Sequence, residues 1–181
     1  MAKRFVKNEQ SLHERALRYL ERFPCTVARM RQYLKKLTRE AIKAEEIEPG
    51  EGESWIDSVI ARLTRVGLLD DAAYARGRAG ALHRKGKSAR AIQFDLRRKG
   101  VDSELIEAAL DSRSENDVNP ELEAAAALAR RRRLGPYASE EKRRDARQKH
   151  LASLARNGFS FDIARRVIDA ATVEDLLEML S

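Results

Sequence analysis

The stretch LRRKGVDSELIEAALD, at residues 96–111, recurs as LARNGFSFDIARRVID at residues 154–169. In each copy a helical pattern ends at a glycine, Gly100 or Gly158, and a second apolar helical pattern follows. Glycine takes the left-handed conformation that ends a helix without a Cβ penalty, and the aspartate or serine two residues later can cap the next helix. Each copy therefore predicts a helix, a tight turn and a second helix, and the recurrence marks a repeat unit.

A further helix is predicted ahead of this pair in each unit. The segment AYARGRAGALHRKG, at residues 73–86, is rich in helix formers, and Ser88 can cap the next helix, which runs through Leu96. An earlier copy of the unit has Thr26 in the place of Ser88 and WIDSVIARL, at residues 55–63, as its third helix. The repeat unit is therefore predicted to contain three helices.

The last copy of the unit begins at Asn119, a cap followed by proline at the first helical position. The Gly-Pro pair at residues 135–136 is predicted to end its first helix, and Ser139 to start its second. Thr172, with an aspartate three residues later, predicts a capping box for a short helix near the C-terminus.

These patterns predict an all-α protein made of three tandem three-helix, helix-turn-helix-like repeats in an elongated, curved arrangement. The first repeat takes residues 1–69, with a basic N-terminal tail and an acidic loop at residues 43–53. The second takes residues 70–115, and the third takes residues 116–181 with the short C-terminal helix.

Charge is distributed in blocks along the 181 residues, whose formal net charge is +7. Residues 70–100 carry nine basic and three acidic side chains, whereas residues 101–123 carry one basic and eight acidic ones. Residues 124–167 are again basic, with twelve basic and four acidic side chains. Two basic blocks separated by an acidic joint predict an acidic partner.

The sequence contains no pattern typical of a catalytic, metal or nucleotide site. The three histidines are scattered, Cys25 is the single cysteine, and neither GxxxxGK[ST] nor GxGxxG occurs. We therefore predict that the protein is not an enzyme and needs neither a cofactor nor a metal. Because one cysteine permits no internal disulfide and the longest apolar run is too short to span a membrane, we expect a cytoplasmic protein without membrane contact.

Three features that could suggest chemistry have structural explanations. Asp70-Asp71 lie at a predicted helix start, where capping accounts for at least one of the two. Trp55 is predicted to pack at the start of its helix, and Cys25 to be a small, half-buried residue rather than a nucleophile.

Three stretches taken together resemble the RecX family of recombinase regulators. They are ALRYLERFPCTVARMRQYL at residues 16–34, GLLDDAAYA at residues 67–75 and LRRKGV at residues 96–101. The similarity covers most of the chain, strongly from residue 12 to residue 111. Departures from the family pattern bear on the partner surface: Arg78 and Leu82 replace a more usual aromatic and arginine, and Lys87-Ser88 replaces an aromatic-glycine pair.

The resemblance implies a fold and a function. It implies three tandem three-helix units, which agrees with the repeat found above, and a protein that binds the RecA recombinase on single-stranded DNA. Such a protein restrains strand exchange and ATP hydrolysis by the RecA filament, modulates the SOS response and needs no cofactor. We expect a monomer that binds single-stranded DNA, with double-stranded DNA as an alternative partner bound without sequence preference.

Basic side chains in the second and third repeats are the candidate contacts to the RecA filament or its DNA. They are Arg84, Lys85, Lys87, Arg90, Arg97, Arg98, Lys99, Arg130, Arg131, Arg132, Arg133, Lys142, Arg143, Arg144 and Arg147. At helical spacing Arg130 and Arg133 would share a face, while the two arginines between them would point elsewhere. The alternative for each side chain is a solvated charge or an intrahelical pair, such as Glu140 with Arg144.

Two other functions are compatible with the sequence. One is a sequence-independent nucleic-acid-binding protein, because few Asn and Gln side chains are available for reading bases. The other is a helical-repeat adaptor that binds only protein. Neither would require RecA, and a steep dependence of DNA affinity on salt would separate the first from the second.

Overall fold

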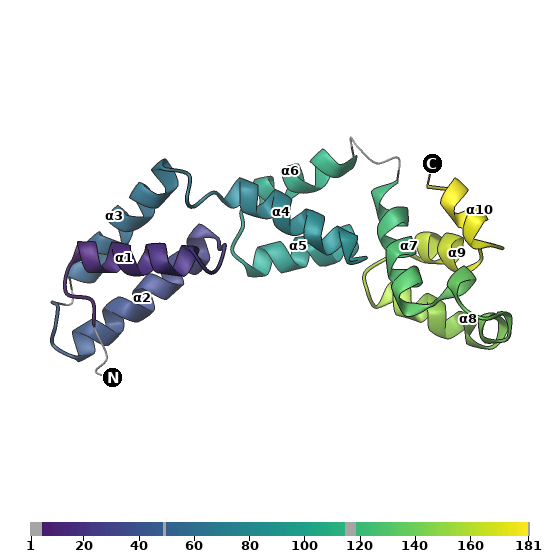
Figure 1. Ribbon diagram of the computed structural model, residues 1–181, viewed down its shortest axis with the longest axis horizontal. Helices are drawn as coiled ribbons and strands as arrows, with labels where there is room; N and C mark the ends of the chain where they lie inside the picture. The colour runs from purple at the N-terminus through teal and green to yellow at the C-terminus, as the bar shows by residue number, and fades with distance from the viewer. Residues whose placement is uncertain (1–4, 49, 115–118, 181) are drawn as a thin grey trace. The chain divides into compact units, whose positions relative to one another are not determined.

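Helices form every regular element that the computed structural model describes, over residues 5–48, 50–114 and 119–180 (Figure 1). The first group is α1 (Glu9–Leu20), α2 (Val27–Lys43) and α3 (Glu51–Arg65), and the second is α4 (Asp71–Arg84), α5 (Ala89–Arg98) and α6 (Ser103–Ser114). The third is α7 (Pro120–Arg132), the 3-10 helix η1 (Gly135–Tyr137), α8 (Glu140–Ala155), α9 (Phe161–Ile168) and α10 (Val173–Glu178). The predicted all-α fold of three-helix repeats is confirmed.

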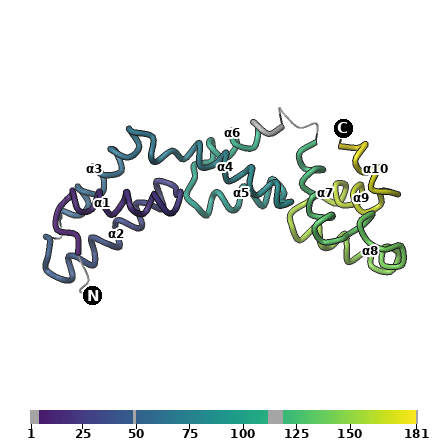
Figure 2. The backbone as a smooth tube through the Cα atoms, in the orientation of Figure 1, coloured from purple at the N-terminus to yellow at the C-terminus, as the bar shows by residue number. Residues whose placement is uncertain are grey.

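The chain forms two compact units. Figure 2 shows the course of the backbone from the N-terminus to the C-terminus. The first unit is Met1–Tyr74 with Lys99–Val101, and the second unit is Ala75–Arg98 with Asp102–Ser181. Repeat boundaries at residues 69 and 115 remain predictions, as does the elongated, curved arrangement. The second boundary lies outside the described residues, and so does the start of the predicted basic tail.

The core of the first unit lies between α1, α2 and α3, whose apolar residues recur three or four positions apart. Leu34 and Leu63 have no exposed surface, and Ile56 is 1% exposed. Burying a side chain of this kind contributes about 1.5–3 kcal/mol. As predicted, Trp55 packs against this core, where it is half-buried. Cys25 was predicted to be half-buried but belongs to the core and is 9% exposed. Burial raises the pKa of the Cys25 thiol to about 11, which leaves the sulfur a poor nucleophile at neutral pH.

The acidic loop predicted at residues 43–53 is shorter in the structure, because α3 begins at Glu51 rather than near Trp55. Gly52 is buried in the first turn of α3, where an added Cβ would lie 3.0 Å from the Thr38 Cβ. The glycine therefore lets the helix start close against α2. Glu51 and Glu53 belong to that first turn, where the helix dipole favours negative charge.

The core of the second unit is centred on α7, α8 and α9. Leu122, Leu128, Leu154 and Val167 have no exposed surface there. Most other buried positions of α7 are alanines, and their small size lets the neighbouring helices approach closely. The predicted capping box at Thr172 is confirmed and starts α10.

One pattern of helix capping occurs twice, at the starts of α2 and α5. The Thr26 hydroxyl donates to the Lys99 carbonyl oxygen at 2.6 Å, within the first unit. In the second unit the Ser88 hydroxyl donates to the Asn157 carbonyl oxygen at 2.8 Å. Each hydroxyl also accepts a backbone N–H of its own helix, at 3.1 Å and 3.2 Å respectively. The predicted correspondence of Thr26 with Ser88 is thus confirmed by their hydrogen bonds.

Acidic side chains complete the same two helix starts. The Val27 N–H donates to an Asp71 carboxylate oxygen at 2.9 Å, and the Ala89 N–H donates to a Glu121 carboxylate oxygen. Asp70 caps its own helix by accepting the Ala73 N–H at 2.9 Å. Both members of the Asp70-Asp71 pair are therefore caps, and the long-range partner of Asp71 could not be inferred from local sequence.

The two glycines of the recurrent stretch both have the predicted left-handed conformation. Gly100 has φ +76° and Gly158 has φ +91°. An added Cβ on Gly100 would lie 2.5 Å from the Ala28 Cβ, and one on Gly158 would overlap the Ser88 hydroxyl. Glycine is therefore required at both positions by the turn and by the close approach of the capped helix.

No helix within the described residues is both long enough and apolar enough to cross a membrane.

Candidate nucleic-acid interface

Arginines 131 and 132 of α7 donate hydrogen bonds inside the second unit. An Arg131 guanidinium N–H donates to the Lys85 carbonyl oxygen at 2.6 Å, and one from Arg132 donates to the Ser153 hydroxyl at 2.9 Å. Both side chains are thereby oriented by protein groups. They were predicted as candidate contacts, and the structure gives each a role in joining helices.

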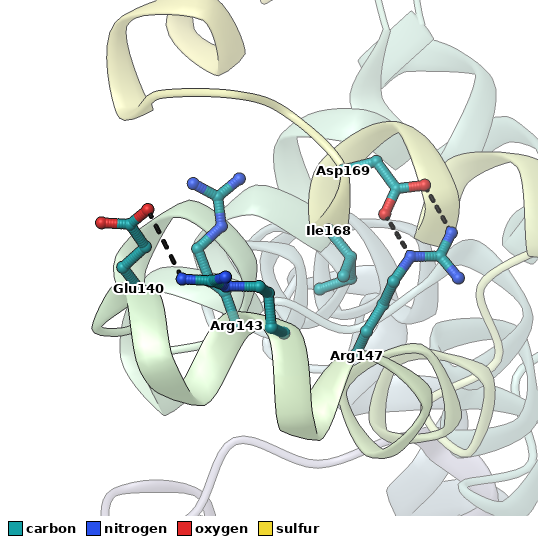
Figure 3. A pocket seen from close by; sticks show the side chains of 6 residues that line it. Glu140, Arg143, Arg147, Ile168 and Asp169 are labelled. Carbon is teal, nitrogen blue, oxygen red and sulfur yellow. Dashed lines mark hydrogen bonds and ion pairs between the residues drawn. The ribbon is translucent and has the colours of Figure 1, made fainter.

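Arg143 and Arg147 of α8 reach the end of α9 and the residues after it. Arg143 donates to the carbonyl oxygens of Ala170 and Ala171. Arg147 forms a bidentate ion pair with Asp169 at 2.7 Å and 2.6 Å (Figure 3). Arg143, Arg147 and Asp169 border a hollow of about 330 Å³. Because Arg147 is paired with Asp169 and Arg143 already donates to two carbonyl oxygens, these two arginines have fewer donors left for an anion in the hollow.

The Arg147–Asp169 pair is predicted to stabilise the second unit in a pH-dependent way. The hydrogen bond from Arg147 lowers the pKa of the Asp169 carboxyl, although desolvation opposes the shift. This stabilisation is therefore present above the ordinary pKa of 3.8 and is lost as the pH falls through the lowered pKa. Asp169→Asn should lower the urea midpoint modestly at pH 7 and have little effect at pH 2.

A matched control for this prediction lies beside the pair. Glu140→Gln removes the contact with Arg144, which is 4.0 Å long between side chains that are 81% and 88% exposed. A pair this exposed should leave the urea midpoint unchanged. The Glu140–Arg144 pair, named above as an alternative to a partner contact, is thus present in the structure. Equal effects of Asp169→Asn and Glu140→Gln on the urea midpoint would contradict a special role for Asp169.

The run of arginines at the end of α7 differs from its prediction. The helix ends at Arg132, and Arg133 is left-handed with φ 55°. The Leu134 N–H bonds to the Ala129 carbonyl oxygen at 2.9 Å, and the Leu134 side chain is buried in the core. Burial of Leu134 thus turns the chain before the Gly-Pro pair. The prediction that Arg130 and Arg133 share a helical face is wrong, because Arg133 lies outside the helix.

Two predicted candidates meet in an open groove of about 420 Å³ in the second unit. Lys87 and Arg90, at the start of α5, lie on one side, and the turn between α8 and α9 supplies Arg156 and Gly158 on the other. Phe94 lines the same groove and is 63% exposed. The groove combines positive charge with an exposed aromatic ring, as surfaces that bind single-stranded nucleic acid do.

The sequence-based candidate set lacks Phe94 and Arg156. A signal for Phe94 is present in the sequence, since Ile92 and Leu96 occupy the core-facing positions of α5 and a residue midway between them must face elsewhere. Arg156 has no comparable local signal. Its place in the groove depends on the packing of the α8–α9 turn against α5.

A second basic hollow, of about 630 Å³, lies around the end of α7. It is lined by Arg132, Arg133 and Lys142, together with Tyr137 and His150. The His150 Nδ1 accepts the Gly135 N–H at 3.2 Å, and burial lowers the pKa of its imidazole. A neutral histidine therefore holds the turn, and the positive charge of the hollow comes from Arg132, Arg133 and Lys142.

The remaining candidates lie on the surface. Arg98 places its guanidinium carbon 5.9 Å from the centre of the Phe94 ring, within the range of a cation–π contact. No ion pair with a described residue is found for the others, and all are exposed: Arg84, Lys85, Arg97, Lys99 and Arg130.

Arg78 is one of the positions at which the sequence departs from the RecX pattern. It forms a bidentate ion pair with Asp95 at 2.8 Å and 3.1 Å, so it joins α4 to α5.

No group of three or more potential metal ligands is found among the described residues.

Comparison with known proteins shows which family the sequence resembles. The family model of the second three-helix domain of RecX matches residues 70–110. A regulatory protein RecX of Myxococcus xanthus is 39% identical over 88% of this chain and 84% of its own length. The chain belongs to the RecX family.

Further RecX proteins support the assignment. The regulatory protein RecX of Agrobacterium fabrum is 33% identical over 92% of this chain and 85% of its own length. The crystal structure of RecX from Lactobacillus salivarius has a TM-score of 0.66, at 22% identity, and the match covers 95% of this chain and 96% of that one. The structural likeness supports the RecX fold, and the sequence relatives carry the name of a regulatory protein rather than an enzyme.

Proposed function

We propose that this RecX-family chain regulates a RecA recombinase by binding its filament on single-stranded DNA. The bound protein restrains ATP hydrolysis and strand exchange by the filament, and through them the SOS response. Family membership carries the proposal, because a relative 39% identical across most of both chains is a regulatory protein RecX. We further propose that it acts in the cytoplasm as a monomer, without a cofactor.

The positive charge of the second unit supports a RecA filament on single-stranded DNA as the partner. Two basic hollows, one around Lys87 and Arg90 and the other around Arg133 and Lys142, would be attracted to an anionic nucleoprotein filament. Contacts spread over several repeats would reinforce one another, since each bound repeat raises the effective concentration of the next. Modest individual contacts would then give stable binding.

Co-sedimentation tests the proposal. The protein is mixed with RecA filaments on single-stranded DNA, with the same DNA alone, and with RecA alone. We expect much more protein in the filament pellet than DNA binding alone accounts for. Equal retention on naked DNA and on filaments would favour the alternative of a sequence-independent nucleic-acid-binding protein.

Salt dependence separates that alternative from a protein-only adaptor. Phosphate contacts release counterions, so direct DNA affinity should fall steeply as salt is added. An adaptor would bind naked DNA weakly at any salt concentration. The basic groove with its exposed Phe94 favours direct DNA binding as part of the regulatory function.

A further inference from the structure

Phe94 is an exposed aromatic side chain at a position where the core does not need one. Its neighbours Ile92 and Leu96 are 1% and 0% exposed, whereas Phe94 is 63% exposed. Arg98 lies one helical turn further on and approaches the ring to 5.9 Å. The ring therefore presents a flat apolar surface beside a cation, and a nucleic-acid base stacks on such a surface.

Cations border the ring on both sides of the groove. Lys87 precedes α5, Arg90 lies in the first turn of α5, and Arg156 lies in the turn after α8. No acidic residue is among those that line the groove, and none of these three cations forms an ion pair with a residue in the described ranges. Their charges are therefore available to phosphates, unlike those of Arg143 and Arg147.

Hydrogen bonds hold the two walls of the groove together. The Ser88 hydroxyl donates to the Asn157 carbonyl oxygen, and the Asn157 side-chain amide donates to the Ser153 carbonyl oxygen at 2.8 Å. The left-handed Gly158 lacks the Cβ that would collide with Ser88. The two walls that carry the cations are thus held together before a ligand arrives, which lowers the ordering cost of binding.

We propose that this groove binds a single nucleic-acid strand, with one base stacked on Phe94 and the adjacent phosphates contacted by Lys87, Arg90 and Arg156. In a duplex the faces of internal bases are covered by their neighbours, so the ring favours a single strand. The inference rests on the proposed function in one respect, because we identify the bound strand with the single-stranded DNA of the recombinase filament. Binding of naked single strands by the protein alone follows from the groove itself.

Direct binding of a fluorescein-labelled oligothymidylate tests the groove without any recombinase. Phe94→Ala should weaken binding by about tenfold, as expected for the loss of one stacked base. Phe23→Ala is the matched control, because Phe23 is a 54% exposed phenylalanine in the first unit and contacts Tyr19 rather than a basic groove. Its affinity should equal that of the wild type. An unchanged affinity of a folded Phe94→Ala variant would overturn the proposal.

An abasic oligonucleotide of the same length separates stacking from charge. Phe94→Ala should bind this strand as well as the wild type does, because the strand has phosphates but no base to stack. Arg90→Glu should weaken binding of both strands and make the salt dependence shallower by about one unit of slope. Equal losses for Phe94→Ala on the abasic and the normal strand would overturn the stacking role.

The outcomes distinguish this inference from the function on which it rests. A Phe94→Ala variant that keeps full affinity for oligothymidylate but no longer binds filaments would show that the groove contacts the recombinase, which overturns the stacking site. Conversely, wild-type protein that binds oligothymidylate as expected but leaves the recombinase unaffected would support the groove and contradict the proposed regulation alone.

Discussion

Gly86→Ala should destabilise the second unit by about 3 kcal/mol or more, measured by urea unfolding. Gly86 follows α4 with φ +67°, which costs about 1–2 kcal/mol for a residue with a side chain. An added Cβ would also lie 2.7 Å from the Leu128 backbone nitrogen and 2.8 Å from the Ala124 carbonyl oxygen. Backbone atoms of α7 cannot rotate out of the way, so the helices must separate.

Two other glycine substitutions separate the conformational strain at Gly86 from the steric clash with α7. Gly67 has φ +73° with no atom within 4 Å of an added Cβ, so Gly67→Ala should cost only the conformational strain. Gly77 lies inside α4 with similar open space, so Gly77→Ala should be neutral or stabilise by up to about 1 kcal/mol. A Gly86→Ala variant no less stable than Gly67→Ala would mean that the turn at Gly86 does not lie as close to Ala124 and Leu128 of α7 as the structure shows.

Reversing the charge of the groove should abolish most of the inhibition of the recombinase. The triple variant Lys87→Glu, Arg90→Glu and Arg156→Glu replaces three cations around Phe94 with anions. We expect about a 100-fold higher concentration to be needed for half-inhibition, since each lost phosphate contact weakens binding and the new charges repel the filament. Arg90 lies inside a helix, where glutamate is also a good helix former, and Lys87 and Arg156 lie outside the helices, so circular dichroism should be unchanged.

A triple variant with the same change in net charge provides the control. Lys36, Arg39 and Lys43 are exposed on α2 and form no ion pair with a described residue. Their replacement by glutamate should leave inhibition within about threefold of the wild type, because only long-range attraction is reduced. If both triple variants lose inhibition equally, net charge rather than the groove attracts the filament.

Local sequence was sufficient to predict much of the fold. The caps at Thr26, Ser88, Asn119 and Thr172 depend on hydrogen bonds within one turn, and all four are observed. Repetition of these local signals defined the three-helix unit without reference to any long-range contact. The end of α7 was misplaced because the burial of Leu134, a tertiary effect, turns the chain earlier than the Gly-Pro pair would.

The candidate site was less predictable, because charge along the chain does not reveal what each side chain contacts. Arg143 and Arg147 were indistinguishable from Arg90 in sequence, yet the first two bind carbonyl oxygens and Asp169 while Arg90 lines an open groove. Arg156 joins that groove only because the α8–α9 turn contacts the start of α5. Such contacts between distant segments decide which cations remain free for a partner.

Steady-state ATP hydrolysis by RecA on single-stranded DNA tests the central claim most directly. The protein is added before or after filaments form, and its competition for naked DNA is measured in parallel. The account predicts inhibition at substoichiometric protein, beyond what competition for DNA explains, and the order of addition separates blocked growth from disassembly. ATP hydrolysis that is unchanged at equimolar protein, or reduced only as far as DNA competition predicts, would contradict a filament regulator.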